Sequence, residues 1–252
     1  MTATAPSLRL DWRRSVGGVA SAGALALALT GCGAEEKEPE TNGLDQLPAA
    51  EIEERAQEAA AGAATVRLSG TVLTEHGSFR IDVRLGEDGG MGEVSADGTT
   101  FELLRVGDDL YIKADQQFWE SEGIPEELES DPTETLDSMY VRVVPEDPAY
   151  AELSGFTDKN TLLDGLLALD GEREAGGEGE IDGTPTIRVE ADGGAGGAME
   201  VSLTGTPYPL RLERGGEAGQ LSMDDWGEEF SLNAPKEDEI IDYGDAVINP
   251  DE

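Results

Sequence analysis

The feature that most constrains the fold is a period-two alternation of apolar and polar residues between residues 65 and 114. The alternating runs read TVRLSGTVL, SFRIDVRL, MGEVSAD, TFELLRV and DLYIKA. Such alternation is typical of strands that bury one face. The runs are separated by turns at His76-Gly77, Asp97-Gly98 and Gly107-Asp108, and an Asp-Gly pair between alternating runs is a strong hairpin signal. The region therefore predicts an antiparallel meander with one apolar face and one wet face.

A second set of alternating runs occupies the C-terminal third of the chain. These runs read TPTIRVEA, AMEVSLTG, YPLRLER, QLSMDDW and EEFSLN, and YVRVV at residues 140–144 predicts one strand between the two sets. Glycine-rich turns such as residues 193–197 separate the later runs. That turn lies between strands and opens no helix, so it is not a dinucleotide-binding fingerprint.

Two segments have the pattern of helices. Residues 47–63 are rich in Ala and Glu, with Pro48 suited to the first turn and Gly62 to the end. Their apolar stripe consists of Leu47, Ile52, Ala56, Ala59, Ala60 and Ala63. The second segment, DKNTLLDGLLAL, is capped by Thr157 or Asp158 and ends before Gly171. We expect its leucines to pack against the apolar faces of the strands.

The order of these elements favours an α+β fold in which one large, curved antiparallel β-sheet carries helices against one face. We expect a single domain over residues 47–242. Residues 236–252 are rich in acids and predict a frayed tail, of which residues 243–252 lie outside the domain.

The N-terminal 31 residues have the organisation of an export signal. Arg9, Arg13 and Arg14 precede an uncharged apolar stretch that is short for a membrane span. The stretch ends in Leu29-Thr30-Gly31-Cys32, which resembles the bacterial lipobox. The resemblance implies that Cys32, the only cysteine, becomes the first mature residue and carries diacylglycerol and palmitate. Both the general and the twin-arginine export routes remain open.

Residues 32–46 predict an acidic tether between this anchor and the domain, because they contain almost no large apolar residue. The lipid would hold the protein at the extracytoplasmic face of the cell membrane.

The charge of the chain excludes whole classes of partner. With 17 Lys and Arg against 55 Asp and Glu, the net charge is −38, which argues against nucleic acid because phosphate contacts need cations. The acids are spread along the chain and are interpreted as a solubility device. Residues 120–137 hold eight acids and no base. This segment is interpreted as a solvated loop, with a cation or partner site as the alternative, although it lacks an EF-hand calcium motif.

No motif in the sequence calls for catalysis. The single histidine, His76, lies in a predicted turn, and neither a nucleophile elbow nor a zinc-ligand set accompanies it. A phosphate-binding loop is absent as well. We therefore expect a non-enzymatic protein without cofactor or metal.

Several segments resemble the LolA-like lipoproteins of actinobacteria, the LprG/LppX group. They are the lipobox, the Ala-rich helix leading into TVRLSGTV, VGDDLYIKADQQFW, YVRVV, the leucine-rich helix and the late run from GTPYPLRLERGG to NAPKEDEIID. The resemblance implies a half-barrel with helices over its concave face and a lipid between them. The residues expected to line that hydrophobic cavity are Phe79, Ile81, Val83, Leu85, Phe101, Leu103, Leu110, Ile112, Leu162, Leu163, Leu166 and Leu167.

Two hypotheses follow. In the first, the protein is a monomeric envelope lipoprotein that binds or carries a lipid between sheet and helices. In the second, the same fold has a filled core, and its acidic surface binds a protein or cell-wall partner. The sequence leaves open which of the two holds.

Overall fold

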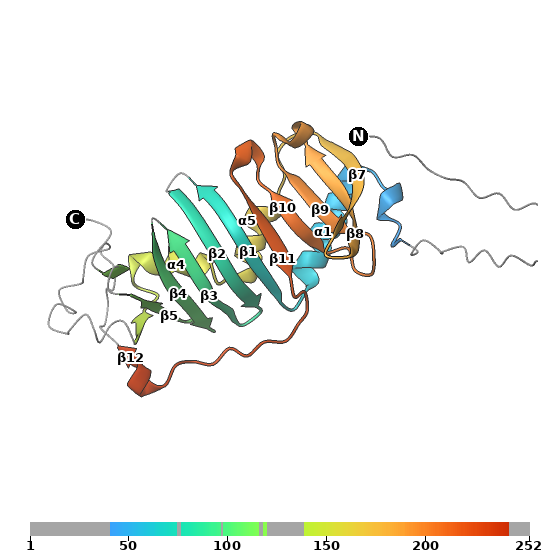
Figure 1. Cartoon of the computed structure of the whole chain (residues 1–252). Coiled ribbons are helices and arrows are strands. Elements are labelled where there is room, and N and C mark those ends of the chain that lie inside the picture. The colour runs from blue at the N-terminus through green and yellow to red at the C-terminus, as the bar shows by residue number, and fades with distance from the viewer. Residues whose placement is uncertain (1–40, 75–76, 97, 116–117, 120–138, 242–252) are drawn as a thin grey trace, which may run out of the picture. The chain divides into compact units, whose positions relative to one another are not determined.

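Two antiparallel meanders, joined side by side, form the β-sheet (Figure 1). The computed structural model describes residues 41–74, 77–96, 98–115, 118–119 and 139–241. The first meander contains β1 (Val66–Thr74), β2 (Gly77–Gly86), β3 (Gly89–Ala96), β4 (Thr99–Val106), β5 (Asp109–Ala114) and β6 (Tyr140–Val143). The second contains β7 (Arg173–Ile181), β8 (Thr184–Ala191), β9 (Ala198–Ser202), β10 (Pro209–Glu213) and β11 (Gly219–Asp224).

The two meanders meet where the first strand of one pairs with the last strand of the other. β1 pairs antiparallel with β11, from Arg67 opposite Asp224 to Val72 opposite Gly219. The short β12 (Ile240–Ile241) pairs with β6 and is parallel to it. Over the described residues the sheet has twelve strands, in the order β12-β6-β5-β4-β3-β2-β1-β11-β10-β9-β8-β7. This confirms the predicted α+β class with one large, mostly antiparallel sheet.

The strand register places the apolar residues of the first meander in rows on one face. One row runs Leu68, Val83, Gly92, Leu103, Ile112 and Val141 across successive strands. Apart from the glycine, every member of the row is buried. The alternation of the sequence therefore becomes one continuous apolar face.

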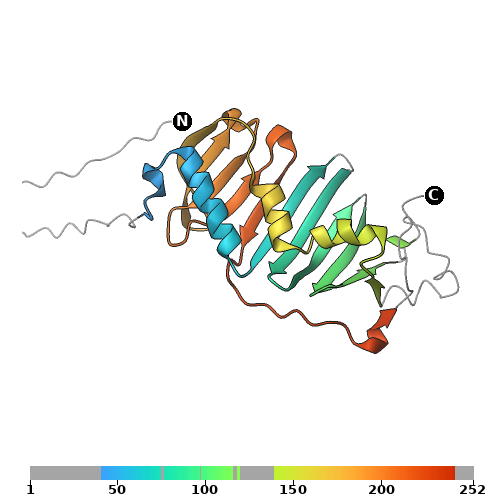
Figure 2. The same ribbon diagram turned by 180° about the vertical axis from the view of Figure 1, so that it is seen from behind.

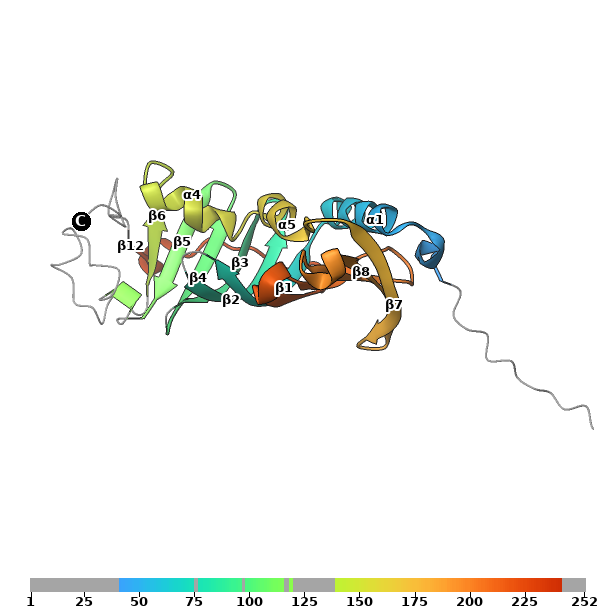
Figure 3. The ribbon, with the colours of Figure 1, turned by 90° about the horizontal axis from the view of Figure 1, so that it is seen from above.

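The helices cover that face. Figure 3 shows α1 (Ala49–Gly62), α4 (Pro148–Gly155) and α5 (Lys159–Leu167) on the same side of the sheet. Seen from behind, α1 crosses the second meander, whereas α5 and α4 lie over the middle of the sheet and the first meander (Figure 2). The described residues also form the 3₁₀ turns η1 (Leu44–Gln46), η2 (Asp192–Gly194), η3 (Gly215–Glu217) and η4 (Glu237–Glu239).

The structure differs from the predicted elements in three places. The run EEFSLN forms no strand, because it has no partner strand and continues as extended chain past the end of β1, where Thr65 Oγ1 donates to the carbonyl oxygen of Glu228. β7 and α4 were not predicted. β7 is an exposed edge strand without an apolar face, and α4 is too short for a helical period to stand out.

Residues near both ends of the described chain take part in the fold. Asn42 donates its backbone N–H to the carbonyl oxygen of Leu203, and Leu44 is buried, so the predicted tether already packs on the sheet at these residues. At the other end β12 lies within the stretch predicted to fray. The predictions for residues 1–31, Cys32, His76, the acid-only segment 120–137 and the tail 243–252 lie outside the described residues.

Candidate functional site

An apolar groove of about 360 Å³ lies between the middle of the sheet and α5. Val72 of β1 and the β2 residues Phe79 and Ile81 form its floor. The other side is formed by Gly155, Phe156, Thr161, Leu162, Gly165 and Leu166, and Arg214 lies at one end. Val72, Phe79, Phe156 and Leu162 are apolar side chains that pack on the core while staying partly exposed. The groove is thus a place where the apolar face of the sheet is not fully covered.

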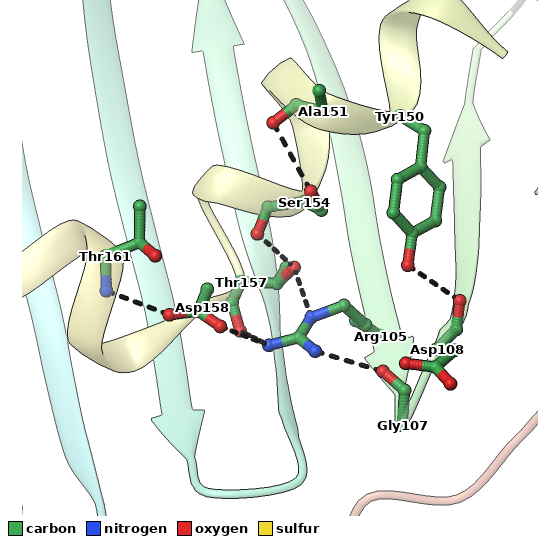
Figure 4. Close-up of polar contacts among 9 residues, drawn as sticks. All are labelled: Arg105, Gly107, Asp108, Tyr150, Ala151, Ser154, Thr157, Asp158 and Thr161. Atoms are coloured by element: carbon green, nitrogen blue, oxygen red, sulfur yellow. Dashed lines mark hydrogen bonds and ion pairs between the residues drawn. The ribbon is translucent and has the colours of Figure 1, made fainter. Parts of the chain in front are cut away.

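Arg105 holds the link between α4 and α5 down on the sheet (Figure 4). In the pairing of β4 with β5, Arg105 lies opposite Leu110, so its side chain is on the apolar face of the sheet. Its guanidinium donates to Thr157 Oγ1 at 3.2 Å, Thr157 O at 2.9 Å, Asp158 Oδ2 at 3.3 Å and Gly107 O at 3.0 Å. The link therefore has a fixed height above β4.

Asp158, one of the two predicted caps, is the N-cap of α5. Its Oδ1 accepts from the backbone N–H of Thr161 at 2.8 Å, and this hydrogen bond lowers the pKa of the carboxyl. Its other oxygen accepts from Arg105. One carboxylate thus joins the start of α5 to the guanidinium that holds the link.

Gly90 allows the link to lie directly on the sheet. A Cβ at this position would lie 3.0 Å from the carbonyl oxygen of Thr157 and 2.7 Å from Leu85 Cδ2. A side chain there would make Leu85 move and the link shift by a few tenths of an ångström. The absence of a side chain at Gly90 therefore lets the link lie close to β3.

Lys159 fixes the other side of α5 to α1. Its ammonium is buried and donates to the carbonyl oxygens of Ala61 at 3.1 Å and Ala63 at 2.7 Å. A cation is stabilised at that place because carbonyl groups and the negative end of the helix dipole face it. In addition, Gln57 Nε2 donates to Leu167 O at 3.1 Å. Helix α5 is thus held between α1 and the sheet, and it leaves the groove open on its remaining side.

The twelve predicted cavity residues divide into two groups. Four of them line the groove: Phe79, Ile81, Leu162 and Leu166. The other eight belong to the buried core cluster and do not line the groove: Val83, Leu85, Phe101, Leu103, Leu110, Ile112, Leu163 and Leu167. Val83, Leu85, Leu103, Leu110 and Ile112 are at most 1% exposed. The structure brings the twelve to the same face. It opens the groove beside four of them, and Leu163 and Leu167 line a separate hollow of about 260 Å³ between α1 and α5.

The groove also contains residues that the sequence did not single out. Val72 shares a face with Leu68 in the strand pattern and could have been found on that signal. Gly165 interrupts the leucine-rich helix, and a Cβ built on it meets nothing within 4 Å. Phe156 stacks obliquely near Phe79, with ring centroids 6.1 Å apart. Phe156 and Arg214 gave no sequence signal, because tertiary packing alone brings them to β1 and β2.

The lining of the groove is almost wholly apolar, with Arg214 as its charged side chain. None of the described groups with a shifted pKa lines it. Nor do the residues that the structure describes contain a cluster of His, Cys, Asp or Glu suited to a metal ion. Among the same residues, no helix combines the length and apolar character that crossing a membrane requires.

The sheet and its helices define a LolA-like half-barrel, as the sequence resemblance predicted. The chain has the fold of LprF from Mycobacterium bovis, with a TM-score of 0.53 and 15% identity over 74% of this chain and 96% of LprF. Lipoprotein LppX from Mycobacterium tuberculosis superposes with a TM-score of 0.43 and 17% identity, over 73% of this chain and 97% of LppX. At these identities the likeness concerns the fold. No protein-family model matches the chain, and no curated protein matches its sequence.

Proposed function

We propose that this chain is a lipid-anchored envelope protein that binds an acyl chain in the groove between β1, β2 and α5, without catalysing a reaction. The observation that carries the proposal is the groove itself: about 360 Å³ lined almost wholly by apolar side chains. Pockets of roughly 300–1,000 Å³ with apolar walls are typical of small-molecule sites.

The energetics of the groove favour a long chain. Each buried methylene contributes about 0.8 kcal/mol, whereas association costs at least about 4 kcal/mol in lost freedom of motion. A chain of a few carbons would not offset that cost. One that fills the groove would exceed it, and this supports an acyl chain over a small apolar molecule.

Anchoring through Cys32 would keep the groove near the membrane, which would be the source of the acyl chain. In this proposal the export signal over residues 1–31 is removed, and the lipid on Cys32 holds the domain at the extracytoplasmic face of the membrane. Two acyl chains give stable attachment where a single one is marginal.

A different function rests on the eight predicted residues that belong to the core cluster and do not line the groove. If those residues represent the whole interior, the protein is an interaction lipoprotein, and its acidic surface binds a partner. The groove would then be a surface irregularity without a ligand.

Filling the groove distinguishes the two functions. Gly165→Leu puts a side chain into open space, and replacing a helical glycine should stabilise the chain by up to about 1 kcal/mol. We expect detergent-free wild-type protein to yield extractable lipid by mass spectrometry, and the variant to yield much less at an equal or higher melting temperature.

Gly62→Leu is the matched control, since Gly62 also lies in a helix, a Cβ there also meets nothing, and it lines no part of the groove. This variant should keep its lipid. Absence of lipid from all three proteins would contradict acyl-chain binding and favour the interaction lipoprotein.

A further inference from the structure

Arg214 is a cation at the end of an apolar groove. It follows β10, and its Nη1 donates to the carbonyl oxygen of Gly165 at 3.2 Å. Among the described residues it forms no ion pair with a carboxylate. By contrast, Arg188 binds Glu190, Glu200 and Glu213 on the sheet. In a chain with a net charge of −38, an arginine without a carboxylate partner beside a binding groove has capacity to bind an anion.

The volume of the groove limits the ligand to one chain. A methylene group occupies about as much space as a liquid water molecule, ~30 Å³. The groove of about 360 Å³ therefore holds about twelve such groups. A second long chain of the same molecule would have to lie in solvent, so a lipid with several long chains fits poorly.

A second hollow lies on the other side of Arg214 and affects where an anionic head can bind. It adjoins the groove, shares Leu166 and Arg214 with it, and has a volume of about 330 Å³. Asp170 borders this hollow, whereas the Glu213 carboxylate accepts from Arg188. The Asp170 carboxylate disfavours further negative charge there, so an anionic head gains most by stopping at Arg214.

We propose that the groove takes a single-chain amphiphile with a small anionic oxygen head, with Arg214 as the residue that binds the head. This inference rests on the proposed acyl-chain function and names the class of ligand. A guanidinium suits such a head because its planar fork matches the two oxygens of a carboxylate or of a phosphate ester. Fatty acids and monoalkyl phosphates are the two sources of that chemistry.

The test compares four probes of equal chain length: laurate, dodecyl phosphate, dodecanol and dodecyltrimethylammonium. Binding is measured by calorimetry, below micelle-forming concentrations, on the full chain carrying Cys32→Ser so that no acyl chain of its own competes. We expect one or both anions to bind about tenfold tighter than dodecanol, as a charge-assisted hydrogen bond provides. The ammonium probe should bind no better than dodecanol. Which anion binds more tightly identifies the source.

Arg214→Gln should remove the preference for anions over dodecanol. Arg211→Gln is the control: it changes the charge equally, but Arg211 lies one residue before the buried Leu212 and so projects from the other face of β10. It should leave the preference intact. A saturated fatty-acid series should gain about fourfold in affinity per methylene up to about twelve carbons and then level off.

The outcomes separate the two proposals. Equal binding of dodecanol and both anions, or a preference that survives Arg214→Gln, overturns the role of Arg214 while acyl-chain binding stands. Affinity that keeps rising well beyond twelve carbons overturns the single-chain limit. If no probe binds, or if Gly165→Leu leaves every affinity unchanged, the proposed function itself fails.

Discussion

Arg173, at the start of β7, donates two hydrogen bonds to Glu53 in the middle of α1: Nε to Oε2 at 2.6 Å and Nη2 to Oε1 at 3.1 Å. The Glu53 side chain is 8% exposed and that of Arg173 is 26% exposed. Glu53 Oε1 also accepts from Gln57 Nε2 and from the backbone N–H of Leu169. One carboxylate therefore connects the first helix, the end of the α5 segment and the edge strand of the sheet.

Removing either partner of this pair should be costly. Glu53→Ala leaves the partly exposed guanidinium of Arg173 without its carboxylate. Loss of one partner costs about 3–5 kcal/mol at buried sites, and the partial exposure of Arg173 places our expectation near the lower value. Urea denaturation of the two single variants and the double variant would measure the coupling. Glu51→Ala serves as the control, because its pair with Arg55 is exposed and should contribute under about 0.5 kcal/mol. Equal losses at the two sites would contradict the assignment.

Arg105→Lys should loosen the link between α4 and α5. A lysine keeps the charge but cannot reproduce the four donor positions of the guanidinium. We expect a loss of about 2 kcal/mol, and faster amide exchange confined to residues 148–167. Arg84→Lys is the comparison, since its single ion pair with Asp225 at 3.2 Å is on the surface. Uniform exchange over the whole sheet would argue against a local role for Arg105.

Two carboxyls on the outer face should respond to pH in opposite directions. Burial, together with the nearby charge of Asp225, raises the pKa of Asp224, and its Oδ1 has no hydrogen-bond partner. The protonated carboxyl therefore favours the folded state. This contribution to stability is fully present below the unfolded pKa and is lost as pH rises through the folded pKa. Asp224→Asn should raise the melting temperature at pH 7 by roughly 1–4 °C, with no gain below the unfolded pKa of about 3.9.

Asp82 provides the opposite sign. Its hydrogen bond from Arg67, with Nη2 and Oδ2 2.7 Å apart, lowers the pKa of the carboxyl. The stabilisation is present above the unfolded pKa and is lost as pH falls through the folded one. Asp82→Asn should therefore lower the melting temperature at pH 7 and lose its effect in acid. The same sign for both variants would show that net charge alone governs the response.

Cys32→Ser tests the anchor. The wild-type protein should partition into the membrane fraction, and its intact mass should correspond to a chain that begins at Cys32 and carries lipid. The variant should be released or remain unprocessed. A mature start at another residue, with no lipid attached, would remove the lipoprotein assignment.

The meander of β1–β5 could be predicted because each of its strands buries one face and the alternation survives in the sequence. The N-cap at Asp158 was among the two predicted candidates for the same kind of reason, since capping is a local interaction. β7 could not be found in this way, because the exposed segment REAGGEGEI has no apolar face. The run EEFSLN failed for the opposite reason, since it alternates but has no partner strand.

The groove was harder to predict than the face it lies on. Periodicity identified the side on which Phe79, Ile81 and Leu85 lie but not the height of the helices above them. That height depends on the hydrogen bonds of Arg105 and on the close approach that Gly90 allows, and neither alters a hydrophobic pattern. As a result, Leu85 is sealed in the core while Phe79 borders open space.

An open sheet has two strands whose outer backbone groups are unpaired, and such edges are templates for polymerisation. On β7 these groups are flanked by Glu174, Glu178 and Glu180, all exposed. A second molecule that added its own β7 in register would bring like-charged rows within a strand spacing of about 5 Å, well inside the Debye length of ~8–10 Å. The repulsion grows with every strand added, so the acidity of β7 makes fibre growth from this edge self-limiting.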